Sequence, residues 1–187
     1  FGKNFITSTC HDNAGNLWIS TWFGGGVNLF DLNTHQFKNY LKEYNIVSVL
    51  EDSDHVLWAG SDRGLYRYNK AADNFIRFTD PVSLTEVSSI FNMVEDDQGS
   101  LWLGTSDGIV RINRQRNEIK LFGKNYGVGN NGMSYGASYK GRDGKLYFGD
   151  GTGYFSFDPE LLAEDVRPPE IIISGFQLAN QAIKPGD

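Results

Sequence analysis

Hydrophobic and polar residues alternate in short runs along most of this chain, and turns rich in Asp, Asn and Gly separate the runs. Four of them are VNLFD from Val27, LYRYN from Leu65, IVRIN from Ile109 and YFSFD from Tyr154. Alternate residues of a strand point to opposite faces of a sheet, so this period of two predicts half-buried β-strands. No stretch carries a long helical pattern, although residues 159–165 could form one short helical turn.

A second kind of strand is apolar on both faces and recurs at a nearly constant interval. The segments DNAGNLWIST, DSDHVLWAGS, DDQGSLWLGT and GRDGKLYFGD start at positions 12, 52, 96 and 141. Their aromatic residues Trp18, Trp58, Trp102 and Tyr147 are 40, 44 and 45 positions apart, the period of a four-stranded propeller blade. We therefore expect an all-β fold of about four four-stranded antiparallel β-propeller blades, part of a larger propeller, with no significant helix. The blades cover residues 1–166, with repeats near 5–45, 46–89, 90–132 and 133–166.

The two ends of the chain depart from the repeat. The fourth unit lacks a recognisable fourth strand, and four blades close a ring only at the small end of the known range. A larger propeller is therefore expected, with open edges on the outer blades that pair with a second copy or are capped by the tail. The start at Phe1, without Met or a signal peptide, is expected of a piece of a longer protein. Residues 167–187 are expected to form a linker and the first strand of a following domain, because Arg167-Pro168-Pro169 precedes the run EIIISGFQLAN.

Antiparallel pairing of the four strands in each unit, A to D in chain order, sorts the loops between the two ends of a blade. The A–B and C–D turns share one end, and the B–C and D–A loops share the other. The A–B turns are short and rich in Asp and Gly, whereas the D–A loops at 41–45, 79–88 and 123–132 are longer and more varied. Binding residues concentrate on long loops of a rigid scaffold, so the B–C/D–A end is the candidate functional face.

Composition narrows the class of protein. The 13 Phe, 9 Tyr and 4 Trp make up 14% of the 187 residues, and 22 Gly accompany them, as is typical of strands joined by tight turns. A net charge of −6 argues against nucleic acid or an anionic membrane surface as a partner. The single Cys10 excludes a disulfide within the chain and a cysteine-built zinc site. No apolar run approaches the ~20 residues that span a bilayer.

Several motifs suggest chemistry, but each fits a structural role better. Residues 127–132 match G-x-G-x-x-G, yet a strand-like segment follows where a dinucleotide site needs a helix. The acidic turns at 51–54 and 95–97 lack the spacing of an EF-type calcium loop, and Asp at a turn start normally accepts bonds from its own backbone. Glycoside hydrolysis needs converging carboxylates, or a tyrosine with arginines, and the three histidines are isolated from one another. We expect no catalytic residue, no metal site and no cofactor.

A ligand-binding surface on the B–C/D–A end remains. Trp22 and Phe23 are adjacent aromatics in a Gly-rich loop, where exposed apolar rings are costly unless they cover something. Flat aromatic faces together with planar hydrogen-bonding groups suit a carbohydrate. The alternative is that the two rings plug the ring of blades or contact a neighbouring domain. The candidate ligand-binding residues are Trp22, Phe23, Asp62, Arg63, Asp107, Asp150, Asn125, Tyr126, Asn130 and Asn131.

The recurrent pattern Asp-x-x-Gly-x-Leu-Trp-x-Gly-Thr, followed by Gly-Leu/Val/Ile and a strand ending in Phe-Asp or Tyr-Asn, resembles the two-component regulator propeller repeat. The exit segment from Arg167 resembles the entry strand of the immunoglobulin-like domain that follows such propellers. Departures are local, because His55 replaces a turn Gly, Ser20 replaces a strand Gly and Tyr147 replaces a Trp.

The resemblance implies the periplasmic sensor region of a Bacteroides-type hybrid two-component system, where such propellers commonly sense oligosaccharide breakdown products and control a cytoplasmic histidine kinase. We therefore expect a non-enzymatic sensor segment whose partners are an oligosaccharide, the rest of the sensor ectodomain and a second copy in a homodimer. This segment is expected to contact no nucleic acid and to reach the membrane only through the parent protein. The alternatives are a protein–protein interaction propeller with no small-molecule ligand and, as a second rival, a propeller lyase or hydrolase.

Overall fold

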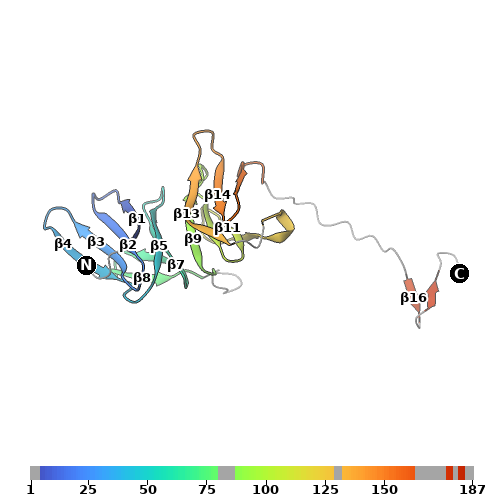
Figure 1. The fold of residues 1–187 in the computed structure, drawn as a ribbon, viewed down its shortest axis with the longest axis horizontal. Helices are drawn as coiled ribbons and strands as arrows, with labels where there is room; N and C mark the ends of the chain where they lie inside the picture. Colours follow the sequence, from blue (N-terminus) through green and yellow to red (C-terminus); the bar gives the residue numbers. More distant parts are fainter. Residues whose placement is uncertain (1–4, 80–86, 129–131, 163–175, 179–180, 184–187) are drawn as a thin grey trace.

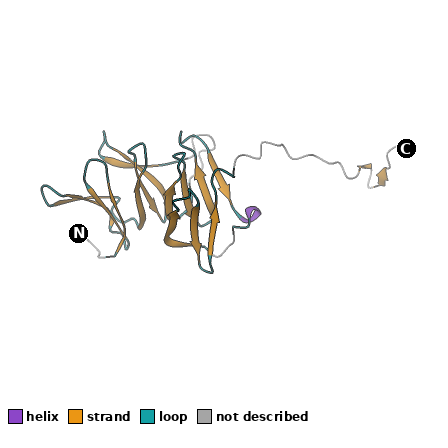
Figure 2. Ribbon diagram, turned by 90° about the horizontal axis from the view of Figure 1, so that it is seen from above, coloured by secondary structure: helices purple, strands orange, loops and turns teal. Residues whose placement is uncertain are grey.

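The structure is a computed structural model, and it describes residues 5–79, 87–128, 132–162, 176–178 and 181–183. In this part of the chain almost all regular structure is β-strand, with a 3-10 turn at Lys124–Tyr126 (Figures 1 and 2). The strands are β1 (Ile6–His11), β2 (Leu17–Thr21), β3 (Gly26–Asp31), β4 (Gln36–Tyr40), β5 (Ile46–Glu51), β6 (Leu57–Ser61), β7 (Gly64–Asn69), β8 (Asn74–Arg77), β9 (Ile90–Glu95), β10 (Leu101–Thr105), β11 (Gly108–Ile112), β12 (Ile119–Phe122), β13 (Met133–Lys140), β14 (Leu146–Asp150), β15 (Tyr154–Phe157), β16 (Phe176–Leu178) and β17 (Gln181–Ile183).

The strands form successive antiparallel sheets, and each of the first four sheets along the chain is one blade (Figure 1). The first three blades are the four-stranded sheets β1–β4, β5–β8 and β9–β12, in which spatial order follows chain order. Their innermost strands β1, β5 and β9, together with β13, pack side by side, so the blades stand like vanes around one axis. The all-β propeller prediction is confirmed.

The fourth blade has no fourth strand among the described residues, in line with the sequence analysis. It consists of β13–β15 only, and within the described residues β15 is followed by a turn in which the Leu161 N–H donates to the Asp158 carbonyl (3.2 Å). β16 and β17 form a separate two-stranded hairpin. The linker expected at 167–169 and most of the run at 170–180 lie outside the described residues, so the immunoglobulin-like domain stays a prediction.

In the first three blades an Asp at the start of the A–B turn binds the Trp six positions later. The indole Nε1 donates to one carboxylate oxygen, and the other oxygen accepts the backbone N–H groups two and four positions along the turn. A buried indole N–H needs such an acceptor, and a bond to a charged group is stronger than one between neutral groups. One carboxylate thus fixes both the turn and the next strand. The pairs are Asp12–Trp18 (2.8 Å), Asp52–Trp58 (2.7 Å) and Asp96–Trp102 (2.7 Å).

The fourth blade lacks both members of this pair. Gly141 and Tyr147 stand at the positions of the Asp and the Trp, and a Cβ on Gly141 would lie 2.4 Å from an Asp143 carboxylate oxygen. A tyrosine offers no donor where the indole N–H would be, so an Asp at position 141 would have no ring partner. The Asp and the Trp therefore occur together in the first three blades, and both are absent from the fourth.

Each Trp lies on the blade face that the next blade covers. Trp18 meets Tyr68 and Phe75 of the second blade, with ring centroids 5.0 and 6.0 Å apart. Trp58 lies in a buried cluster against which Ile119 of the third blade packs. These contacts explain why strands β6 and β10 are apolar on both faces, since each is sandwiched between neighbouring sheets, whereas the described contacts of β2 with another blade lie on its Trp18 face.

A Gly two positions after Trp58 and after Trp102 lets residues of the innermost strand β9 pack close to the backbone, as the repeat predicts. A Cβ on Gly60 would lie 2.6 Å from Ile90 Cγ2, and a Cβ on Gly104 would lie 2.4 Å from Asn92 Oδ1. The first blade has the buried Ser20 instead, whose hydroxyl bonds the Thr7 hydroxyl (2.8 Å) and the Ser8 carbonyl (3.1 Å). These two hydrogen bonds satisfy the buried Ser20 hydroxyl.

A polar contact at the residue before the turn Asp links consecutive blades. Glu51 accepts the Asn13 N–H of the first blade (2.8 Å), and Glu95 accepts the Ser53 N–H of the second (2.9 Å). At the third interface the same position is Lys140, which instead donates to the Asp97 carboxylate (2.6 Å). Lys140 is positive where Glu51 and Glu95 are negative, and the carboxylate of Asp97 pairs with it. A polar contact is therefore kept at the third interface.

The outer parts of the first two blades meet at the carboxylate of Asp73. It accepts hydrogen bonds from Lys38, Tyr40 (2.7 Å) and Tyr68 (2.7 Å). These bonds, that from Lys38 first, hold the pKa of Asp73 well below its ordinary value. Burial, together with bonds to Tyr68 and Asp73, raises the pKa of Tyr40.

Replacing Asp96 by Ala is expected to lower the free energy of unfolding by about 2–4 kcal/mol, because it leaves the Trp102 N–H and two turn N–H groups without their acceptor. Urea denaturation followed by tryptophan fluorescence measures this. The control is Asp143→Ala in the corresponding turn of the fourth blade, whose half-exposed carboxylate binds no indole. It should stay within about 0.5 kcal/mol of wild type. Equal effects of the two substitutions would contradict the anchoring role of the pair.

Asp73→Asn is expected to remove part of the acid sensitivity of the fold. The folded-state pKa of Asp73 is depressed, so its stabilising effect is present above the unfolded-state pKa of about 3.9 and is lost as the pH falls below it. The variant should unfold at lower urea concentration than wild type at pH 6, and the difference should shrink toward pH 2. A difference independent of pH would show that the three bonds do not favour the ionised form.

Candidate functional site

A hollow at the B–C/D–A end, which we call the aromatic cleft, is lined by Phe5, Thr7, Trp22, Phe23 and Tyr135 and has a volume of about 290 Å³. Trp22 and Phe23 come from the loop between β2 and β3, whereas Tyr135 comes from β13 of the fourth blade. The ring centroids of Trp22 and Tyr135 are 5.3 Å apart at an interplanar angle of 70°. The cleft therefore joins two blades that are not consecutive in the chain.

The loop that carries Trp22 and Phe23 is held by backbone hydrogen bonds. The Trp22 N–H donates to the Phe5 carbonyl (2.9 Å), and the Gly24 N–H donates to the Asn45 side chain (2.9 Å). Phe23 itself has a φ of +55°, a left-handed conformation that is strained for a bulky side chain, and its ring is 60% exposed. The Phe23 ring packs edge-on against the Phe5 ring, with centroids 6.0 Å apart.

A β-bulge sets the position of Tyr135. The β13 strand has eight residues where β1, β5 and β9 have six, and its pairing with β14 is interrupted between Met133 and Ser138. Gly136 inside the bulge has a φ of +67°, and Asn92 of the third blade donates to the Ser134 carbonyl (2.9 Å). Bulges re-aim side chains beside functional sites, and this one leaves the Tyr135 ring 61% exposed against Trp22.

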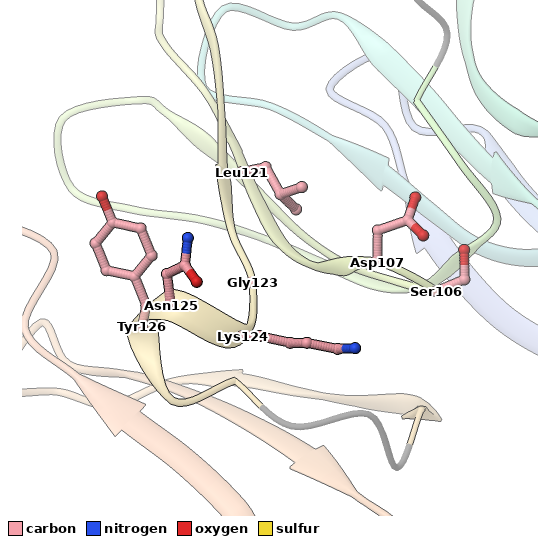
Figure 3. Close-up of a pocket in the computed structure, with 7 residues that line it drawn as sticks. All are labelled: Ser106, Asp107, Leu121, Gly123, Lys124, Asn125 and Tyr126. Atoms are coloured by element: carbon pink, nitrogen blue, oxygen red, sulfur yellow. The ribbon is translucent and has the colours of Figure 1, made fainter. Parts of the chain in front are cut away.

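A second, more polar hollow lies at the same end of the third blade (Figure 3). Ser106 and Asp107 line it from the loop between β10 and β11, and Lys124, Asn125 and Tyr126 line it from the segment after β12. Its volume is about 500 Å³. Figure 3 shows Lys124 extending toward the loop of Ser106 and Asp107, so a cation and a carboxylate border the same space.

The candidate residues of the second blade contact the loop between β4 and β5, whereas Asp150 of the fourth blade is bound within its own loop. Asp62 accepts a bond from the Asn45 side chain (2.8 Å), and the Arg63 guanidinium stacks 4.7 Å from the centre of the Tyr44 ring. The other carboxylate oxygen of Asp62 is buried and has no hydrogen-bond partner among the described residues. Asp150 accepts the N–H groups of Thr152 (2.8 Å) and Gly153 (2.6 Å), which lower its pKa.

The sequence-predicted residues thus separate into groups. The structure brings Trp22 and Phe23 to one hollow and Asp107, Asn125 and Tyr126 to another, while Asn130 and Asn131 lie outside the described residues. Sequence reasoning missed Phe5, Thr7 and Tyr135. The signal for Tyr135 was present, because strand A of the fourth blade is two residues longer than strand A of the other three.

Groups suited to nucleophilic or metal chemistry do not gather at this end. His11 ends β1, His35 lies in the turn between β3 and β4, and His55 lies in the turn between β5 and β6, all at the opposite end of the blades. Among the described residues no three His, Cys, Asp or Glu side chains lie close enough together to hold a metal ion. The described part of the chain also contains no helix long and apolar enough to cross a membrane.

Comparison with solved structures finds the same fold within longer chains. The extracellular domain of a hybrid two-component system of B. thetaiotaomicron is similar over 98% of this chain and 27% of its own length, with a TM-score of 0.76 and 20% identity. A second such domain from the same organism is similar over 84% of this chain and 30% of its own, with a TM-score of 0.51 and 17% identity. Virginiamycin B lyase from Staphylococcus aureus is similar over 82% of this chain and 55% of its own, with a TM-score of 0.62 and 16% identity. This chain therefore spans only about a quarter of the first of these proteins.

Comparison with protein families gives a match to the two-component regulator propeller over residues 1–23 and 84–107. A search of curated proteins gives no match. The matched segments include strand A and the Trp-bearing strand of the first and third blades, and the second blade repeats the same Asp–Trp pair. These two segments are similar to the two-component regulator propeller repeat.

Proposed function

We propose that this chain is part of the extracytoplasmic, periplasmic sensor region of a hybrid two-component system and that a glycan-derived ligand binds in its aromatic cleft. Occupancy of the cleft is passed on to a histidine kinase of the parent protein. The repeat family and the similarity in fold to extracellular domains of hybrid two-component systems support the sensor role.

The observation that carries the ligand proposal is the construction of the cleft. The half-buried ring of Trp22 and the exposed rings of Phe23 and Tyr135 face one hollow. A residue with a left-handed φ and a β-bulge hold them there. Aromatic faces pack against the C–H faces of a sugar ring, and the Thr7 and Tyr135 hydroxyls supply hydrogen-bonding groups. The volume lies near the lower limit of about 300 Å³ for small-molecule sites, which fits a short oligosaccharide or its terminal unit.

The position of the cleft suggests how binding becomes a signal. Because Trp22 belongs to the first blade and Tyr135 to the fourth, a ligand between them changes the distance between non-consecutive blades. Such a ligand shifts the equilibrium between two arrangements only by the difference in its affinity for them. In a homodimer of the parent protein, the favoured arrangement would reorient the segment that leads to the membrane.

We propose that the segment binds without catalysis. The three histidines lie at the end of the blades away from the cleft, and the cleft itself is lined by aromatic rings and one threonine. A protein partner in place of a sugar is the alternative use of the same exposed rings, since aromatic residues are also enriched at interfaces.

Trp22 is expected to be the tryptophan that collisional quenchers reach. Trp18, Trp58 and Trp102 are at most 2% exposed, whereas Trp22 lies partly exposed at the cleft. Acrylamide should therefore quench a fraction of the fluorescence that disappears in Trp22→Phe, and a bound ligand should protect that fraction. Unchanged quenching in the variant would place Trp22 away from solvent.

Ligand binding is tested by titrating a panel of oligosaccharides into both the 187-residue chain and the complete ectodomain in a calorimeter. Phe23→Gly and Tyr135→Ala are expected to weaken binding of the active oligosaccharide by about tenfold or more, equal to about 1.4 kcal/mol. Phe23→Gly relieves a left-handed φ, so it should be no less stable than wild type, and lost binding cannot then be ascribed to unfolding.

The matched control for these variants is Tyr139→Ala, an exposed tyrosine of β13 that does not line the cleft. Heat from an oligosaccharide that is the same in wild type and Phe23→Gly would exclude the cleft as its site. Binding of a partner protein that the same variants abolish, with no oligosaccharide effect, would favour the interaction propeller.

A further inference from the structure

The second hollow at the B–C/D–A end, which we call the polar hollow, presents free groups of both charges (Figure 3). Asp107 and Lys124 line it, and neither side chain has a hydrogen bond or an ion pair with another described residue. Ser106 and Asn125 add a hydroxyl and an amide that also lack a partner among the described residues. A carboxylate and an ammonium group therefore border one space without neutralising each other.

The wall that carries Ser106 and Asp107 is a turn held by hydrogen bonds on both sides. The Ser106 N–H donates to the Ser89 carbonyl (3.2 Å), and the Asp107 N–H donates to the Thr105 hydroxyl (3.2 Å). That buried hydroxyl in turn donates to the Gly108 carbonyl (2.9 Å). The backbone under both side chains is thus fixed by bonds in which the two side chains take no part.

The opposite wall is the 3-10 turn that follows β12. The Tyr126 N–H donates to the Gly123 carbonyl (2.9 Å), and the Gly127 N–H donates to the Lys124 carbonyl (3.0 Å). The Tyr126 ring packs against the buried Phe122, with centroids 5.0 Å apart. This wall is also formed before a ligand arrives, which lowers the entropy cost of binding.

Close backbone contact fixes the two walls relative to each other. Gly108 has a φ of +136°, and a Cβ on it would lie 2.5 Å from the Phe122 carbonyl oxygen. A Cβ on Gly123 would lie 3.3 Å from the Asp107 carbonyl oxygen. The hollow is therefore a preformed feature of the third blade.

In the second blade the corresponding turn uses its charged side chains within the protein. Asp62 accepts a bond from the Asn45 side chain (2.8 Å), and the Arg63 guanidinium lies 4.7 Å from the centre of the Tyr44 ring. The third blade has no such contact at Asp107 among the described residues. Its charged groups are thus available to a ligand.

We propose that the polar hollow binds a small zwitterion of peptide type, in which an ammonium group and a carboxylate flank an apolar body. Lys124 pairs with the ligand carboxylate, Asp107 pairs with its ammonium group, and Ser106 and Asn125 bond the amide between them. At neutral pH an exposed Asp is negative and an exposed Lys is positive. A ligand of one charge would be attracted by one of these groups and repelled by the other, whereas a zwitterion satisfies both.

The size and the remaining walls of the hollow fit such a ligand. Leu121 and Tyr126 are 49% and 58% exposed, and they supply apolar surface for the body of the ligand. The volume of about 500 Å³ lies within the range of about 300–1,000 Å³ for small-molecule sites. No lining residue is shared with the aromatic cleft, so this inference does not rest on the proposed glycan site.

The probes are alanyl-leucine and alanyl-alanyl-leucine, which differ in the separation of their charges. They are titrated into the isotopically labelled 187-residue chain, and backbone amide NMR signals are followed. At least one probe should shift the signals of Ser106, Asp107 and residues 124–126 saturably. Acetylation of its amino group or amidation of its carboxyl group should each weaken binding by about two- to fivefold, because ion pairs at exposed sites are weak.

Two variants test which side chain recognises which end of the peptide. In Lys124→Gln the free peptide and its amide should bind equally, whereas the preference over the acetylated peptide remains. In Asp107→Asn the pattern is reversed, and a merely structural effect of either substitution would not remove one preference and keep the other. The matched control is Lys145→Gln, a half-exposed lysine of the A–B turn of the fourth blade, which should keep both preferences.

The proposal is overturned by the absence of saturable shifts with both peptides at about 20 mM, or by equal binding of the free, acetylated and amidated forms to wild type. Unchanged preferences in Lys124→Gln and Asp107→Asn would also overturn it. Maltose that shifts the same signals with higher affinity than the peptides would show a sugar site instead. Phe23→Gly alters only the aromatic cleft and should leave peptide binding unchanged, so this test and the glycan test fail independently.

Discussion

The bond between a turn carboxylate and a buried indole organises each of the first three blades. A strand sandwiched between two neighbouring sheets must be apolar on both faces, and Trp supplies the largest contact area for that position. Its N–H then needs a buried acceptor, and the Asp that begins the preceding turn is the nearest group able to provide one. The same carboxylate fixes the turn backbone, so one side chain links local conformation to packing between blades.

Some contacts between neighbouring blades involve the same Asp–Trp pairs. The Arg116 guanidinium of the third blade donates to the Asp52 carboxylate (2.8 Å) and lies over the Trp58 ring, which adds a cationic partner to the buried acid. At the third interface the Asp–Trp pair of the fourth blade is missing, and Lys140 with Asp97 replaces the contact between a glutamate and the backbone. Each blade contacts mainly its neighbours, so the free energy of unfolding is approximately a sum over blades and their interfaces. One interface can therefore use a different polar contact without disturbing the others.

The aromatic cleft contains two locally strained features that the surrounding blades hold in place. A phenylalanine with a positive φ and a bulge that contains Tyr135 each cost free energy, and the hydrogen bonds of the surrounding loops and strands maintain them. Asn92 reaches from the third blade to the bulge of the fourth, so the position of Tyr135 depends on two blades. A site that spans blades responds to their relative arrangement, which is the property that a sensor requires.

The repeat period, the Trp-bearing strands and the loops at each end were determined by the sequence alone, as was the lack of a fourth strand in the described part of the last blade. They follow from local rules: alternation of apolar residues, turn residues at fixed offsets, and Gly where strands approach closely. The grouping of site residues was decided only by the tertiary structure. Trp22 and Tyr135 are far apart in the chain and meet because the blades curve around an axis, whereas Asp107 and Asn125 fall in another hollow. Distances across an axis depend on the angle between sheets, and that angle is set by the packing of many side chains rather than by any one segment.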